Sequence, residues 1–219
     1  MAAEMRAWFK AWRLRFGRRR RNADARDGGL TLVELLVAMT VFSVLIVVSI
    51  ALYMTMAKTT TAETQRATAN DQVRLAVWDI ERQVRSGNVL YSPSLDSSGN
   101  PIVLVYTQAN GNQRCVEWRY NVAKQALETR SWTTTYKLDG NVSPWRVVAI
   151  HVVNDLKNPA QQPFVLNSAA GYGGRLLDLH FFSKSGLTSG SPAEIASSVA
   201  GRNTSYGYSP NLCLPIPPG

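Results

Sequence analysis

Residues 26–39 read RDGGLTLVELLVAM, and one glutamate, Glu34, stands near the start of a long apolar run. From Leu30 to Ala57 the chain has 28 consecutive residues, and Glu34 is the only charged one among them. A carboxylate within a membrane helix costs roughly 2.5–3.5 kcal/mol at the centre of the bilayer and less near its edge, unless it finds a partner. The apolar run and the partner of Glu34 therefore both need an explanation.

The apolar run is long enough to cross a membrane. Leu35 to Ala57 contains 23 residues without a charge, about 35 Å of helix at 1.5 Å per residue, and about 20 residues suffice for the hydrocarbon core. The arginine run Arg18–Arg21 precedes it, so the positive-inside rule places residues 1–29 in the cytoplasm. We therefore expect a single-pass protein of the cytoplasmic membrane, with everything after Lys58 outside.

The net charge of +9 is unevenly distributed. Residues 1–29 hold nine Lys or Arg and three Asp or Glu, a charge of +6, which leaves +3 for the remaining chain. Membrane topology explains the arginine run, and the rest of the sequence shows no basic stripe interleaved with aromatic residues. We therefore predict no nucleic-acid partner.

Two simpler explanations of the membrane segment remain as alternatives. Thr55-Met56-Ala57 resembles a weak signal-peptidase site, but the apolar part of a secretory signal is about 7–15 residues long, and this run is far longer. The second alternative is an uncleaved anchor with no further role.

The helical pattern continues beyond the membrane segment. Residues 58–86 contain no Gly or Pro, and four apolar residues recur at intervals of four, three and four, which is one helical stripe: Val73, Val77, Ile80 and Val84. Gly87 follows, as glycine often does after a last helical turn. We predict one helix from about Leu32 to Ser86, with a transmembrane part (residues 30–57) and an amphipathic continuation (residues 58–87).

From residue 88 the pattern changes to period two and to β-forming residues, which predicts an antiparallel β head over residues 88–184. The predicted strands are Ile102–Tyr106, Cys115–Asn121, Leu127–Trp132, Trp145–Asn154 and Leu176–Phe182. Asn110-Gly111 and Ala123-Lys124-Gln125 are predicted hairpin turns. Residues 185–219 are rich in Ser, Gly and Pro and are predicted to be a tail, either held by Cys213 or mobile.

The two cysteines, Cys115 and Cys213, are too few and too far apart for a zinc site of the CxxC kind, and we predict no metal. Outside the cytoplasm they could form a disulfide. The alternative is two buried, unpaired thiols.

An active site is not expected. The only histidines, His151 and His180, lie in strand-like runs, and Asp178 shares a face with His180 because the two are two residues apart. Two histidines on a half-buried sheet explain this arrangement. No hydrolase, zinc-protease or phosphate-loop motif is present, so we predict neither an enzyme nor a cofactor.

The stretch GGLTLVELLVAM resembles the processing site of type IV pilins and pseudopilins. The resemblance implies that prepilin peptidase removes residues 1–29 by cutting between Gly29 and Leu30, and that the new amine of Leu30 is methylated. Glu34 is then the family's glutamate at the fifth position, and pairs with the amine of a neighbouring subunit. The family more often has Phe or Met at the position of Leu30.

Local physics is consistent with this resemblance and leaves one alternative open. Gly28 and Gly29 have no side chains and little helical preference, as a peptidase substrate at the membrane surface requires. Glu34 lies about 6 Å along the helix axis from Leu30. The alternative is that Glu34 complements its own helix N-terminus, which is worth about 0.3–1 kcal/mol.

The stretch AVWDIERQVRSGNV, with the following hairpin that contains Tyr120, Leu127 and Arg130, resembles the J-type minor pseudopilins and related minor pilins. Major pilins commonly carry a proline within the membrane segment, where this chain has Ala51; its first proline is Pro93. The resemblance implies an α+β, pilin-like fold with the long helix packed on an antiparallel sheet.

The implied function is that of a minor pilin or pseudopilin, a structural subunit of a type IV pilus or a type II secretion-like pseudopilus. The resemblance also implies that this subunit acts in filament initiation at the tip. The implied partners are prepilin peptidase, other major and minor subunits, the inner-membrane assembly platform and membrane lipid. The competing hypothesis is a single-pass membrane protein with an exported β-rich binding head.

Overall fold

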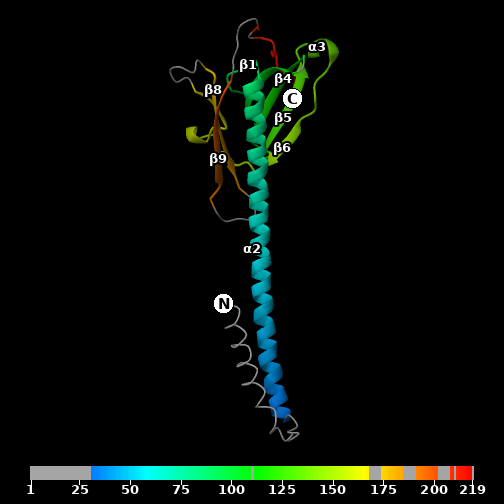
Figure 1. Ribbon diagram of the computed structural model, residues 1–219, viewed down its shortest axis with the longest axis vertical. Coiled ribbons are helices and arrows are strands. Elements are labelled where there is room, and N and C mark those ends of the chain that lie inside the picture. Colours follow the sequence, from blue (N-terminus) through cyan, green and yellow to red (C-terminus); the bar gives the residue numbers. More distant parts are fainter. Residues whose placement is uncertain are drawn as a thin grey trace, which may run out of the picture. The chain divides into compact units, whose positions relative to one another are not determined.

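The computed structural model describes residues 31–109, 111–167, 174–184, 191–201, 208–209 and 211–218 (Figure 1). The predicted leader 1–29, Leu30, Asn110 and parts of the predicted tail (185–190, 202–207, 210 and 219) lie outside the described residues. The chain divides into two compact units, residues 1–55 and 56–219, and each is described by itself.

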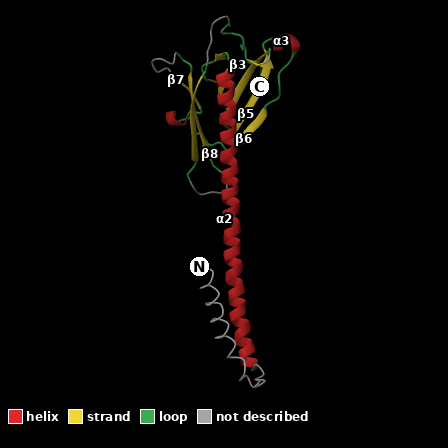
Figure 2. Cartoon of the chain, viewed as in Figure 1, coloured by secondary structure: helices red, strands yellow, loops and turns green. Residues whose placement is uncertain are grey.

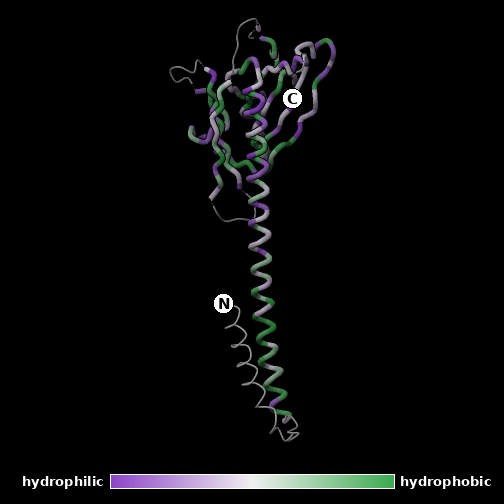
Figure 3. Tube along the Cα trace, viewed as in Figure 1, coloured by the Kyte–Doolittle hydropathy of each residue, from purple (hydrophilic) through white to green (hydrophobic). Residues whose placement is uncertain are grey.

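The helix α2 spans Leu32–Ser86 and confirms the predicted bounds. Apart from Glu34, its part in the first unit is mostly apolar (green in Figure 3), and α2 is long and apolar enough to cross a membrane. Hydroxyl groups in this part are satisfied within the helix: Thr40 Oγ1 donates to the Val37 carbonyl and Ser49 Oγ to the Leu45 carbonyl, both at 2.8 Å. Such internal hydrogen bonds suit an apolar surrounding, because no water is present there to satisfy polar groups.

In the second unit, one face of α2 is buried, and it contains all four residues of the predicted stripe. The buried residues are Ala69, Val73, Ala76, Val77, Ile80 and Val84. The helix ends at Ser86, and the next residue, Gly87, passes very close to the strand Pro101–Ala109 (β3). A Cβ atom at Gly87 would lie 2.5 Å from Val105 Cγ1 and 2.8 Å from the Gln83 carbonyl oxygen, so a larger residue does not fit.

The first sheet is antiparallel and follows the order β1-β3-β4-β5-β6, with β2 paired to β3. Figure 2 shows the strands in yellow and labels β3, β5 and β6 of this sheet. Its strands are β1 Val89–Leu90, β2 Ser94–Leu95, β3 Pro101–Ala109, β4 Asn112–Asn121, β5 Ala126–Thr133 and β6 Arg146–Ile150. Because side chains alternate between the faces of a strand, Trp118, Tyr120 and Leu127 face the buried stripe of α2. Glu117 and Arg119 of β4 lie on the opposite face.

The second sheet has the order β7-β8-β9 and is also antiparallel. It comprises β7 Phe164–Asn167, β8 Leu176–Ser183 and β9 Ala193–Ala200; the short helices α3 Tyr136–Asp139 and η1 Pro159–Gln161 lie in loops. Leu177, Leu179 and Phe181 join the same buried cluster as the α2 stripe. The α+β, pilin-like fold class is therefore confirmed, with two sheets where the sequence analysis expected one.

The prediction of one strand over Trp145–Asn154 is wrong. Strand β6 ends at Ile150, and His151 adopts φ of +63°, a left-handed conformation that interrupts an extended strand. The chain then leaves β5 and forms an isolated bridge between Val152 and Ser183 of the second sheet. Residues 145–154 are β-forming throughout, so the sequence pattern does not indicate that the chain changes its pairing partner within them.

Strand β9 was not expected, because it lies in the range predicted to be a tail. It pairs with β8 along its whole length, from Leu176 with Ala200 to Ser183 with Ala193. Its sequence AEIASSVA is rich in small residues and gives little strand signal of its own.

A segment of residues 211–218, here called the strap, lies across the face of the first sheet that is turned away from α2. Cys213 forms a disulfide with Cys115 of β4, with a Cα–Cα distance of 5.5 Å. The backbone N–H of Cys213 also donates to Tyr91 Oη at 3.2 Å, and Tyr136 Oη donates to the Pro215 carbonyl at 2.8 Å. A second apolar cluster forms beneath the strap, around Trp132 and Tyr106.

Candidate assembly site and head pocket

Glu34 lies in the first turn of α2 and hydrogen-bonds reciprocally with Thr31. The backbone N–H of Glu34 donates to Thr31 Oγ1 at 3.2 Å, and the backbone N–H of Thr31 donates to Glu34 Oε2 at 3.4 Å. The Thr31 hydroxyl contacts the same carboxylate oxygen at 3.5 Å. This is a capping box, in which both residues satisfy N–H groups at the start of a helix.

The capping box gives Glu34 a partner within its own chain. The carboxylate of Glu34 contacts the start of its own helix. This contact agrees with the alternative considered above, in which Glu34 complements the N-terminus of its own helix. Gly29 and Leu30, the predicted cleavage site, lie outside the described residues.

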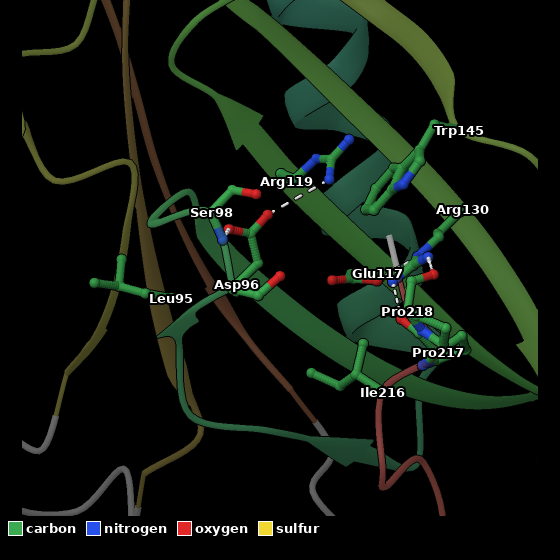
Figure 4. Close-up of a pocket in the computed structure, with 11 residues that line it drawn as sticks. Leu95, Asp96, Ser98, Glu117, Arg119, Arg130, Trp145, Ile216, Pro217 and Pro218 are labelled. Atoms are coloured by element: carbon green, nitrogen blue, oxygen red, sulfur yellow. Dashed lines mark hydrogen bonds and ion pairs between the residues drawn. The ribbon is translucent and has the colours of Figure 1, made fainter.

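A pocket of about 450 Å³, here called the head pocket, opens on the face of the first sheet that is turned away from α2 (Figure 4). Charged side chains of β4 and β5 and the indole of Trp145 line it, between the loop 95–98 on one side and strap residues 216–218 on the other.

The deepest charged pair of the head pocket is Glu117 with Arg130. Arg130 Nε donates to Glu117 Oε2 at 2.6 Å, and both side chains are at least 95% buried. The two Nη atoms of Arg130 donate to the strap, to the carbonyls of Pro217 at 2.7 Å and Pro218 at 3.0 Å. Burial raises the pKa of the Glu117 carboxyl, and the Arg130 hydrogen bond and charge oppose this only in part.

A second pair lies beside it on the same strands. Arg119 donates to Glu128 Oε2 from Nη2 at 2.6 Å and from Nε at 3.1 Å, and its Nη1 lies 3.4 Å from Asp96 Oδ2. Lys124 Nζ adds a bond to Glu128 Oε1 at 2.9 Å. Burial acts to raise the pKa of Glu128, but the hydrogen bonds from Arg119, Lys124 and Asn121 outweigh it and hold the pKa below its ordinary value.

Trp145 covers both arginines. Its ring centre lies 3.6 Å from Arg119 Cζ and 4.3 Å from Arg130 Cζ, within the range of a cation–π contact. Two polar atoms of these residues are buried and have no hydrogen-bond partner among the described residues: Glu117 Oε1 and Trp145 Nε1.

The sequence pattern indicates Arg130 but not its partners. The predicted turn contains the missing signal: Asn121 pairs with Ala126 across it, so the residues four positions further from the turn, Glu117 and Arg130, also face each other. No local pattern places Trp145 over these strands, since it precedes β6 and reaches them only through the fold.

The remaining polar candidates lie in the second sheet and its connection. Asp178 Oδ1 accepts from Ser198 Oγ at 2.6 Å, and His180 Nδ1 lies 3.6 Å from Glu194 Oε1, while His151 marks the end of β6. Within the described ranges, no three His, Cys, Asp or Glu residues are placed to hold a metal ion.

One comparison with known proteins gives a match. A family model, the prokaryotic N-terminal methylation motif, matches residues 24–50, a range that includes Gly29, Leu30 and Glu34. No curated protein and no solved structure shows a significant match to the chain.

Proposed function

We propose that this chain, which its N-terminal methylation motif indicates to be a type IV pilin-like prepilin, is a minor subunit acting in filament initiation at the tip. The filament is a type IV pilus or a type II secretion-like pseudopilus. Prepilin peptidase cuts between Gly29 and Leu30, and the new amine is methylated. The observation that carries the proposal is the motif match, whose residues 32–50 form the first part of the helix α2.

In the proposal Glu34 acts in assembly, although it caps its own helix in the structure. The two hydrogen bonds that Thr31 donates to the carboxylate are 3.4 and 3.5 Å long, beyond the ordinary range, so they hold the carboxylate weakly. Cleavage creates an ammonium group on Leu30, which attracts a carboxylate as an opposite charge, whereas the donors of Thr31 are uncharged. The carboxylate of one subunit therefore exchanges its contact with Thr31 for the amine of its neighbour.

The membrane arrangement follows from α2 and the charges before it. The apolar part of α2 and the motif indicate a membrane-anchored, single-pass protein. In the proposal, residues 1–29 lie in the cytoplasm, because they contain the arginine run, and the head lies outside. The subunit then leaves the membrane for the filament. In this step the apolar part of α2 exchanges contacts with lipid for contacts with other apolar helices.

Two features support a minor rather than a major subunit. The helix continues through Ala51, where major pilins commonly have a proline. The residues that resemble J-type subunits have defined positions in the head: Leu127 is buried, the Tyr120 hydroxyl donates to the Val152 carbonyl at 3.1 Å, and Arg130 holds the strap.

The surface of α2 in the second unit offers a contact for another subunit. Leu75 and Trp78, three residues apart on one helical face, are 63% and 59% exposed, and the Arg82 guanidinium lies 5.3 Å from the Trp78 ring centre. Large apolar side chains grouped on an exposed face are typical of interaction surfaces. The proposed partners are other pilin subunits and the inner-membrane assembly platform.

N-terminal mass spectrometry of the membrane-bound protein tests the proposal. We expect a chain that begins at methylated Leu30, and an intact leader in a Gly29→Val variant, whose branched side chain obstructs the scissile bond. An intact leader in the unmodified protein would contradict the proposal. That result would favour a single-pass protein with an exported binding head.

A further inference from the structure

A short motif in the loop between β5 and β6 has no role in the proposed function. Residues 139–143 read DGNVS, and the last three fit the N-x-S/T pattern of an N-glycosylation acceptor, with no proline at x. Asp139 adds the acidic residue that the bacterial form of this motif has two positions before the asparagine. The motif can act only in a surface loop of an exported protein, so the surroundings of Asn141 decide its use.

The structure places this motif in an exposed loop. The loop begins with the short helix α3, none of whose residues is buried, and Figure 1 shows α3 on a part of the chain that projects from the first sheet. Asn141 is exposed, and its side-chain amide has no hydrogen-bond partner among the described residues. Only its backbone is held: the N–H donates to Asp139 Oδ1 at 2.9 Å, and the carbonyl accepts from the Thr133 N–H at 3.2 Å. The side chain that would carry a glycan is therefore on the surface and free to meet an enzyme.

The head also has the chemistry of an exported domain. Cys115 and Cys213 form a disulfide, and disulfides persist in oxidising compartments outside the cytoplasm. N-glycosylation modifies asparagines in surface loops of such exported proteins. The inference therefore rests on the proposed position of the head outside the cytoplasm.

We propose that Asn141 is an acceptor site for N-glycosylation, recognised by an oligosaccharyltransferase through the acid of Asp139 and the hydroxyl of Ser143. The co-substrate is an oligosaccharide carried on a lipid diphosphate. A bond forms between Asn141 Nδ2 and C1 of the first sugar, while the bond from C1 to the diphosphate oxygen breaks. The lipid diphosphate leaves with that bonding electron pair, and one amide proton passes to a base.

The folded loop holds both recognition groups. Asp139 Oδ2 accepts from Thr133 Oγ1 at 2.7 Å. Ser143 Oγ accepts from the Ser131 N–H at 2.8 Å, and Pro144 restricts the backbone of Ser143. The enzyme therefore acts before the loop closes or when it opens, and we expect the parent chain to be modified only in part.

The full-length chain tests the proposal when it is produced in bacterial cells with an acid-requiring oligosaccharyltransferase that works outside the cytoplasm, and with its lipid-linked glycan. Peptide mass spectrometry should find one glycan on Asn141 and none in an Asn141→Gln variant. Residues 203–205, NTS, are an internal control that should stay unmodified, because a glycine stands two positions before the asparagine. Asp139→Asn should lower the modified fraction at least tenfold, whereas Asp139→Glu should retain most of it.

Alkylation of free thiols in the same sample shows whether the head has reached an oxidising compartment. A chain with the disulfide between Cys115 and Cys213 but no glycan on Asn141 would overturn this inference and leave the proposed function standing. Free thiols throughout would contradict the proposed position of the head, and with it the inference. Thr133→Val, which removes one bond to Asp139 and leaves the motif intact, should raise the modified fraction about twofold.

Discussion

Trp118 Nε1 donates a hydrogen bond of 2.7 Å to Gln83 Oε1, and this bond joins β4 to the last turns of α2. The indole is fully buried among the apolar residues between helix and sheet. Its N–H therefore depends on one amide side chain that α2 provides.

We expect Gln83→Ala to lower the free energy of unfolding of the head by about 1–3 kcal/mol, because a buried N–H is left without an acceptor. Urea denaturation, followed by circular dichroism, measures the change. In a Trp118→Phe background the same substitution should cost much less. An equal cost in both backgrounds would show that Gln83 acts through packing alone.

Removal of the disulfide should strongly destabilise the head. The bond between Cys115 and Cys213 spans 98 residues, and the chain-entropy model assigns about 4–5 kcal/mol to a loop of that size. We expect Cys213→Ala to show this loss in urea denaturation. Reductant should destabilise the parent protein and leave the variant unchanged; a parent protein indifferent to reductant would contradict the prediction.

The two buried glutamates should affect the pH dependence of stability in opposite directions. The pKa of Glu128 is lowered from 4.5, so its contribution is present above that pH and is lost as pH falls through the folded pKa. The pKa of Glu117 is raised from 4.5, so its contribution is present below that pH and is lost as pH rises through the folded pKa.

Between about pH 3 and 7, Glu128→Gln should therefore make the unfolding free energy rise less steeply with pH, and Glu117→Gln should make it rise more steeply. Urea denaturation at a series of pH values gives the two slopes. Changes of the same sign in both variants would contradict the assigned shifts.

Glu34→Ala should leave membrane insertion intact and block incorporation into filaments, because the neighbour's amine loses its partner. Thr31→Val is the matched variant. It removes the capping hydroxyl, at a cost of about 0.5–2 kcal/mol to the helix start, but keeps the carboxylate. Shearing and immunoblotting measure filament content. Normal filaments in Glu34→Ala, or an equal loss in Thr31→Val, would contradict the pairing role.

The sequence predicted α2 closely because its signals are local. The apolar run, the stripe from Val73 to Val84 and the terminal Gly87 all lie along one element, and the structure places the helix at Leu32–Ser86. The hairpin between β4 and β5 was predicted for the same reason. Its turn lies between two strands whose partners are close in sequence.

The elements that were missed depend on distant partners. Strand β9 has mostly small side chains, and pairing with β8 makes it a strand. Trp145 becomes part of the head pocket only because β6 pairs with β5 and carries the indole over Arg119. The reciprocal contact of Thr31 with Glu34 follows the known capping-box pattern. The expectation from the sequence placed Glu34 at the helix start but did not include Thr31.

The break at His151 has a consequence for how the head melts. Directly after it, Val152 N–H donates to the Gln125 carbonyl of the β4–β5 turn at 2.9 Å, and Val153 N–H donates to the Phe182 carbonyl of β8 at 2.7 Å. Asn154 Nδ2 adds a bond to the His180 carbonyl. These adjacent residues thus connect the two sheets by hydrogen bonds. We therefore expect the two sheets to unfold together, in a single cooperative thermal transition.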